Sequence, residues 1–207
     1  MPLMKKRIQK RGVSNIEFVL VMATMLTPVL LGVFVFGVSL VREVQAIQVG
    51  REVAELYSRN IDFSRQGNQD VITNYVAVGL GMQGNAGNIT GGGAGNGLVV
   101  LSTYTKNNTT GAANNGHVVV ADRIVIGNQN LYTSVFGNPA PADVASDGSV
   151  AQANQDGHTS NRADNVSNLI ALSAGQSVRM VEVYFKTVSY SLGAMSSGGG
   201  HYSRAIF

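Results

Sequence analysis

The sequence predicts an α+β protein in which a long N-terminal helix packs on a small antiparallel β-sheet with long glycine- and asparagine-rich loops. Three observations support this fold class. Residues 18–41 form an apolar run without a charged residue. A helical spacing of apolar residues continues beyond that run. The rest alternates short runs rich in valine and isoleucine with polar stretches, and the chain has 25 glycines but only 13% charged residues, a composition more typical of strands and loops than of a soluble helical enzyme.

The N-terminal helix is predicted in two parts, one transmembrane and one amphipathic. The apolar run at about 18–41 is long enough to cross a bilayer, which takes roughly 20 residues. Apolar residues then recur at the spacing of an amphipathic helix: Ala46, Val49, Val53 and Leu56, widened by Ile47, Ala54 and Tyr57. Glu55 and Arg59 lie on the opposite side and can pair, and Pro28 is expected to kink the helix. We expect a helix from Val13 to about Arg59, within a region of residues 13–65.

The remaining residues, 66–207, are expected to form one exported α+β domain. Residues 70–80 predict a short second helix, because apolar residues share one face. Runs rich in β-branched and aromatic residues predict four strands: 98–105, 117–126, 131–136 and 177–188. Polar stretches at 83–97, 106–116 and 137–165 are expected loops. We expect 83–97 and 137–165 to be exposed and mobile, because they lack regularly spaced apolar residues.

The start of the apolar run carries a further pattern. The segment Arg11-Gly12-Val13-Ser14-Asn15-Ile16-Glu17-Phe18 places a glycine shortly before a glutamate at the edge of the run. Five cations precede or flank the glycine: Lys5, Lys6, Arg7, Lys10 and Arg11. An isolated carboxylate costs roughly 2.5 kcal/mol or more at the centre of a bilayer. Glu17 is therefore a candidate functional residue, and the partner that its charge requires is an amine.

These residues resemble the signal that prepilin peptidase cleaves in type IV pilins and pseudopilins. The resemblance implies a leader of residues 1–12, cleavage between Gly12 and Val13, and Glu17 as the fifth mature residue. Glu17-Phe18 followed by apolar residues is most similar to the TadE-like minor pilins of tight-adherence systems, with a weaker likeness at residues 123–128 and 182–185. The implied fold is pilin-like, and the implied role is a structural one in a tight-adherence pilus. The implied partners are prepilin peptidase, other pilins and the inner-membrane assembly platform, with Glu17 acting in assembly.

Charge predicts the orientation and location of the chain. Lys and Arg concentrate on the cytoplasmic flank of a spanning helix, so the N-terminus is expected in the cytoplasm and everything after about Val41 outside it. This gives a single-pass protein of the bacterial inner membrane, in contact with lipid, and the resemblance adds the extracellular pilus as a further location. The net charge is +3, from 15 basic and 12 acidic residues, and it is owed to the five leader cations. Because the exported part has no basic, aromatic-interleaved stripe, we expect no nucleic-acid partner.

The sequence contains no recognisable catalytic or metal-binding constellation. It has no cysteine, so disulfides and thiolate metal sites are excluded. The three histidines, at 117, 158 and 201, are too scattered for a zinc motif. Residues 79–84 match G-x-G-x-x-G but lack the acidic residue of a dinucleotide site, and residues 154–157 resemble a calcium loop without an acid in register. We therefore expect no cofactor, no metal and no enzymatic activity.

Other interpretations of the N-terminus stay open. A conventional secretory signal fits poorly, because its apolar core is only roughly 7 to 15 residues long. A plain membrane anchor would make Gly12 and Glu17 coincidental. The alternative function is a membrane-anchored extracytoplasmic module, adhesin-like or lectin-like, whose loops bind a carbohydrate or surface ligand. The mature N-terminus distinguishes these: Val13 supports the pilin, whereas Met1 or a site after residue 40 supports the module.

Overall fold

The computed structural model describes residues 10–84, 89, 92–186, 190–192, 195–197 and 199–207. The chain divides into two compact units, Met1–Val41 and Arg42–Phe207. Helix α1 (Lys10–Ser58) supplies the first unit and the beginning of the second. The helical assignment is unbroken at Pro28.

The first unit is an apolar helical segment whose side chains are exposed. Large hydrophobic residues from Ile16 to Leu30 are about half exposed or more. Among the described residues, α1 is the one helix long and apolar enough to cross a membrane, by length and composition. An exposed apolar surface on this scale is costly in water, so the segment needs lipid or other apolar partners around it.

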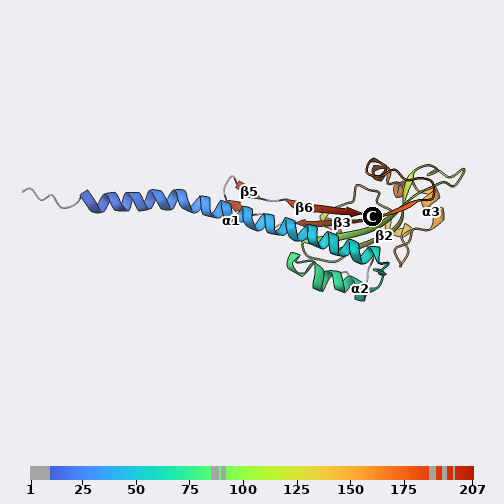
Figure 1. Cartoon of the computed structure of the whole chain (residues 1–207), viewed down its shortest axis with the longest axis horizontal. Coiled ribbons are helices and arrows are strands. Elements are labelled where there is room, and N and C mark those ends of the chain that lie inside the picture. Colours follow the sequence, from blue (N-terminus) through green and yellow to red (C-terminus); the bar gives the residue numbers. More distant parts are fainter. Residues whose placement is uncertain (1–9, 85–88, 90–91, 187–189, 193–194, 198) are drawn as a thin grey trace, which may run out of the picture. The chain divides into compact units, whose positions relative to one another are not determined.

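The second unit is built on a four-stranded antiparallel sheet (Figure 1). The strand order is β2-β1-β3-β6. Its strands are β1 (Gly97–Lys106), β2 (Val118–Gly127), β3 (Ser177–Lys186) and β6 (Gly200–Ile206). Two short strands, β4 (Tyr190–Leu192) and β5 (Met195–Ser197), pair with each other. The predicted strands at 98–105 and 117–126 are confirmed. The strand predicted at 177–188 is confirmed as far as Lys186, and its last two positions, 187 and 188, lie outside the described residues. The α+β class is therefore confirmed, while β4, β5 and β6 were not predicted.

The predicted strand at 131–136 is wrong. Gln129–Leu131 form a 3-10 turn, η3, and residues 132–136 then follow an irregular path. The apolar and aromatic residues that suggested a strand have other partners. Tyr132 stacks on Tyr184 with the ring centroids 5.3 Å apart, and Phe136 is buried in the core.

One face of the sheet packs against the second part of α1. The helix buries the predicted stripe, with Ala46, Val49, Val53, Ala54 and Tyr57 in the core. The sheet contributes Val99 and Leu101 of β1, Ile124 and Ile126 of β2, and Val181, Val183 and Phe185 of β3. Two members of the predicted stripe, Ile47 and Leu56, are less buried. The exposed Glu55–Arg59 ion pair forms as predicted.

Helix α1 ends at Ser58, one residue before the predicted end at about Arg59. Asn60 adopts a left-handed conformation with φ 59°. The Asn60 N–H donates to the Tyr57 carbonyl, and the Ile61 N–H donates to the Leu56 carbonyl, which is the Schellman arrangement that closes a helix. Asparagine tolerates the left-handed region better than most residues, so Asn60 is the local signal for the end of the helix.

Short helical elements follow α1 and partly match the helix predicted at 70–80. They are α2 (Gln66–Val71), the π-helical η1 (Ile72–Val76) and the 3-10 turn η2 (Val78–Leu80). Ile72 and Ala77 are fully buried against the core. Figure 1 shows α2 on the side of α1 that faces away from β3 and β6.

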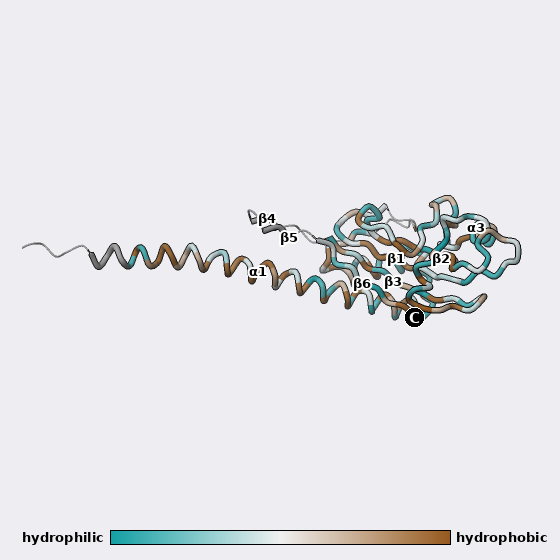
Figure 2. Tube along the Cα trace, turned by 90° about the horizontal axis from the view of Figure 1, so that it is seen from above, coloured by the Kyte–Doolittle hydropathy of each residue, from teal (hydrophilic) through white to brown (hydrophobic). Residues whose placement is uncertain are grey.

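The other face of the sheet is covered by residues 128–176. The stretch 137–165, predicted as an exposed loop, has many exposed residues but also contains short helical turns and buried residues. This stretch contains η4 (Pro141–Asp143), α3 (Gln152–Gly157), η5 (Thr159–Asn161) and the start of η6 (Asp164–Asn168). Val150, Ala163 and Val166 are buried in a second core cluster with Tyr104 and Val120. Figure 2 shows this layer around α3 as mostly hydrophilic beside the hydrophobic strands.

Amide side chains hold this covering layer together. The Asn114 side chain donates to the carbonyls of Gln155 and His158, at 2.7 and 2.9 Å, and its own oxygen accepts from Arg162 at 2.7 Å. Asn107 donates to the Asp156 carboxylate at 2.6 Å. The two bonds donated by Asn114 satisfy backbone carbonyls that regular secondary structure would otherwise pair. The layer therefore orders without the apolar periodicity that the prediction relied on.

A polar cluster attaches the end of α1 to the sheet. Arg179 Nη1 donates to the Tyr57 carbonyl at 3.1 Å, and its guanidinium lies 5.2 Å from the centre of the Tyr57 ring. The Tyr57 hydroxyl is 2.9 Å from the Thr103 hydroxyl. Across the sheet, Thr103 is opposite both Asp122 and Arg179. Burial raises the pKa of Asp122, and a hydrogen bond from Thr103 offsets part of this effect.

Asp122→Asn is expected to stabilise the protein at neutral pH. Because the pKa of Asp122 is raised in the folded state, the native chain binds this proton more tightly than the unfolded chain, and stability falls as the pH rises above about 3.8. The asparagine variant avoids this loss. Its thermal midpoint in detergent should exceed that of the wild type at pH 7, and the two should converge below pH 4.

Asp62 provides the matched control, because its pKa is lowered by hydrogen bonds from Ser64. Asp62→Asn should leave stability unchanged or slightly lower at pH 7, the opposite sign. An Asp122→Asn variant that is less stable than the wild type at pH 7 would contradict the assignment.

Candidate functional site

The predicted processing site lies in the first turn of α1. The backbone is helical from Lys10 onward, so Gly12 and Val13 both have helical backbone in the structure. The preceding leader residues, 1–9, lie outside the described residues. A peptidase that cuts between Gly12 and Val13 must unwind this turn locally, and glycine weakens a helix by about 1 kcal/mol relative to alanine. Glycine at position 12 therefore favours access to the bond.

Glu17 is exposed on the same helix, one turn beyond Val13. Residues spaced i,i+4 lie on the same side of a helix, so the backbone of Val13 and the carboxylate of Glu17 share a face. No ion pair of Glu17 occurs within the part of the chain that the structure describes.

The structure does not assemble the histidines into a metal site. His117 pairs with Asp164 at 3.0 Å, and His158 pairs with the buried Asp143 at 2.8 Å. His201 lies on β6, opposite Phe185. Across the described ranges, no three His, Cys, Asp or Glu residues are grouped to hold a metal ion. The His117–Asp164 pair instead connects the covering layer to the start of β2, and the His158–Asp143 pair lies within the layer.

The other two weak motifs are also structural. Residues 79–84 span η2 and the turn after it, and Gly81 has a left-handed φ of 64°. The segment that resembles a calcium loop is part of α3. There the Asp156 carboxylate accepts hydrogen bonds from Asn107 and Gln152, at 2.6 and 2.8 Å.

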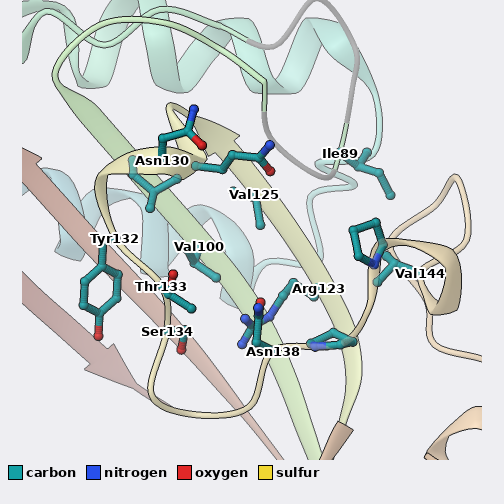
Figure 3. Close-up of a pocket in the computed structure, with 14 residues that line it drawn as sticks. Ile89, Val100, Arg123, Val125, Asn130, Tyr132, Thr133, Ser134, Asn138 and Val144 are labelled. Atoms are coloured by element: carbon teal, nitrogen blue, oxygen red, sulfur yellow. The ribbon is translucent and has the colours of Figure 1, made fainter. Parts of the chain in front are cut away.

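A pocket of about 220 Å³ lies between the sheet and residues 129–144, and sequence reasoning did not identify it. Figure 3 shows strand residues Val100, Arg123 and Val125 on one side, and loop residues Tyr132, Thr133, Ser134 and Asn138 on the other. Ile89, Leu98, Gln129, Asn130, Pro139, Pro141 and Val144 complete the lining. The floor is apolar and the rim is rich in amide and hydroxyl groups, the usual make-up of a small-molecule site.

Buried Glu182 fixes one wall of this pocket. Its side chain is on the sheet face that the covering layer packs against, and the residue is 1% exposed. The Ser134 hydroxyl donates to Glu182 Oε2 at 2.5 Å, and the Tyr202 hydroxyl donates to Oε1 at 2.8 Å. The Tyr132 hydroxyl is 3.4 Å from Oε1. Glu182 thus ties two pocket-lining residues, Tyr132 and Ser134, to β3 and β6.

The charge of Glu182 also affects the tyrosines around it. Burial raises the pKa of Tyr202, and the neighbouring Glu182 raises it further. The pKa of Tyr132 is raised by the same two causes. Both hydroxyls therefore stay protonated as donors at all ordinary pH values. The tilted Tyr132 and Tyr202 rings, 5.2 Å apart, add packing energy to the cluster.

Arg123 is the one charged residue among the described pocket-lining residues, and it is 5% exposed. Its Nη2 donates to the Tyr104 hydroxyl at 3.3 Å and to the Phe136 carbonyl at 3.4 Å. Its Nε has no hydrogen-bond acceptor, and no carboxylate in the described part of the chain lies within ion-pair distance. The pocket therefore contains a buried cation that the protein itself does not neutralise.

The sequence itself contains a signal that could have identified Arg123 and Glu182. Arg123 and Glu182 are each a charged residue inside an otherwise apolar strand, in Val118–Gly127 and Ser177–Lys186. Buried charges cost free energy unless they are paired, so such positions indicate a polar network beneath a covering segment.

Comparison with known proteins gives no assignment: no family model, no curated protein and no solved structure matches the chain.

Proposed function

We propose that this chain is a structural minor pilin or pseudopilin of the tight-adherence type. In this proposal prepilin peptidase removes residues 1–12, the apolar part of α1 holds the mature protein in the inner membrane, and the domain of residues 42–207 is outside the cytoplasm. The observation that carries the proposal is the register of Gly12, Val13 and Glu17 against the apolar run. The proposal includes no catalytic role.

The architecture of the second unit supports this role. The element that contains the apolar run, α1, also supplies Ala46, Val49 and Val53 to the core of the domain. The domain therefore cannot separate from its helix without losing its main packing face. A helix that belongs to the core of the domain suits a structural component better than a flexible tether would.

Intact-mass measurement tests the proposal in cells that contain the peptidase. We expect the membrane-extracted protein to begin at Val13. Gly12→Val should block processing, because a side chain at this position hinders close approach of the peptidase to the backbone. The expected product is then the full-length mass.

Gly32→Val is the matched control, because Gly32 lies in the same helix with open space around its Cα. It should be processed like the wild type. A full-length mass for the wild type in these cells would contradict the proposal.

The alternative function, a membrane-anchored ligand-binding module, is favoured by the pocket that contains Arg123. In that case α1 is only a tether, and the mature N-terminus would be Met1 or a residue after 40. The two functions are compatible if a pilus subunit also binds a ligand.

A further inference from the structure

We infer that the pocket between the sheet and residues 129–144 binds a single acidic sugar, a hexuronic acid whose carboxylate is held by Arg123. The inference goes beyond the pilus function and names a ligand class for the alternative function. It rests on three features of the described pocket: an unneutralised cation, a polar rim and a small size.

The cation determines the charge of the ligand. A guanidinium has five N–H donors, whereas Arg123 makes two long hydrogen bonds, at 3.3 and 3.4 Å, both from Nη2. Its Nε is buried without an acceptor, which is rare in native proteins and calls for a partner. A planar guanidinium and a planar carboxylate can form two parallel hydrogen bonds. A carboxylate is therefore the group that Arg123 fits best. The two long hydrogen bonds are easily broken, so the guanidinium can turn toward a ligand.

The buried acid Glu182 does not serve as this partner. Glu182 accepts from the hydroxyls of Ser134 and Tyr202, at 2.5 and 2.8 Å. No ion pair between Glu182 and Arg123 occurs. The protein thus satisfies its buried carboxylate with neutral hydroxyls and leaves its buried guanidinium for an external anion.

The rim and the size determine the rest of the ligand. Gln129, Asn130 and Asn138 contribute amide side chains, and Thr133 contributes a hydroxyl. These groups can both donate and accept, as a ring of sugar hydroxyls requires. Pro139, Pro141 and Val100 supply apolar surface for the C–H face of a sugar ring. A volume of about 220 Å³ is below the roughly 300 to 1,000 Å³ of pockets for drug-sized ligands, and it suits one sugar ring.

The test is ligand-observed NMR titration of the full-length protein in nonionic detergent micelles. D-glucuronate and D-galacturonate are the probes, and their neutral methyl esters and acetate are the comparisons. We expect at least one acid to bind with a dissociation constant of about 1 mM, given its few non-hydrogen atoms. The esters should bind at least about tenfold more weakly, because they lose the charge-assisted bond. Acetate should not displace the acid, because it lacks the hydroxyls.

Two variants assign the site. Arg123→Gln should weaken binding of the acid by about tenfold or more, while Arg65→Gln, a change to an exposed arginine, should have no effect. Asn138→Asp places a negative charge on the rim without changing a buried residue, so it tests the site even if Arg123→Gln does not fold. It should weaken binding of the acid severalfold and leave the ester unaffected, whereas Asn115→Asp outside the pocket should change neither.

Several results would overturn the inference: no binding of either acid, equal binding of acid and ester, displacement by acetate, or unchanged affinity in Asn138→Asp. None of them bears on processing at Gly12, so the pilus function and the sugar site can fail separately.

Discussion

Glu182→Ala is expected to lower the free energy of unfolding by about 3 kcal/mol. Glu182 is 1% exposed and accepts hydrogen bonds from Ser134, Tyr202 and Tyr132. Its removal leaves the buried Ser134 hydroxyl without its acceptor and opens a cavity beneath residues 132–134. Since this segment forms one side of the pocket, the variant should also release it from the sheet.

Thermal unfolding in detergent, followed by near-ultraviolet circular dichroism of the tyrosines, measures this effect. Glu182→Gln has nearly the same volume and keeps one oxygen acceptor, so its loss should be clearly smaller. Glu55→Ala removes an exposed partner of an i,i+4 pair and should change stability by less than about 0.5 kcal/mol. A Glu182→Ala variant as stable as the Glu55→Ala variant would show that the hydroxyl cluster contributes little.

The parts of the fold that the sequence predicts are those with regular spacing of apolar residues. The stripe of Ala46, Val49 and Val53 marks the buried face of α1, because helical period and burial coincide on a sheet-facing helix. The valine-rich runs of β1, β2 and β3 are central or well-covered strands, so they are apolar enough to recognise.

Edge strand β6 was not predicted, because it lacks the apolar composition of β1, β2 and β3. It carries His201, Ser203 and Arg204 among its residues and is only partly buried, as is common for a strand at the edge of a sheet. Tyr202 and Ile206 are its main apolar contributions. Pairing with β3, rather than its own composition, makes it a strand.

The order within residues 137–165 of the covering layer was not predicted for a different reason. Its buried residues, such as Val150 and Ala163, are isolated in the sequence, and its order depends on amide side chains that reach distant backbone groups. Asn114, for example, bonds to the carbonyl of Gln155. Such contacts have no local period. The pocket was missed with the layer, because it exists only where the layer meets the strands.

Glu17→Val is expected to remove most co-assembly with other pilins while leaving membrane insertion and leader cleavage intact. The reason is the position of the Glu17 charge, together with the proposed processing after Gly12. Cleavage gives Val13 a free amino group, one helical turn from Glu17. A carboxylate at the edge of the membrane is costly without a partner, and the structure provides no ion pair for it within the described residues.

The amine can come from the same chain or from a neighbouring subunit, and resemblance to pilins favours the neighbour. In surroundings of low dielectric, a pair between subunits would fix the axial stagger of packed helices, because only one register brings the charges together.

Glu17→Gln should be affected like Glu17→Val, since both lose the charge. Glu43→Gln changes an exposed glutamate beyond the apolar run and should assemble normally. Recovery of each variant in sheared filaments, or with the inner-membrane platform, is compared with the wild type. If Glu17→Val were recovered as fully as the wild type, Glu17 would be an incidental interfacial residue, and α1 would be better explained as a plain anchor.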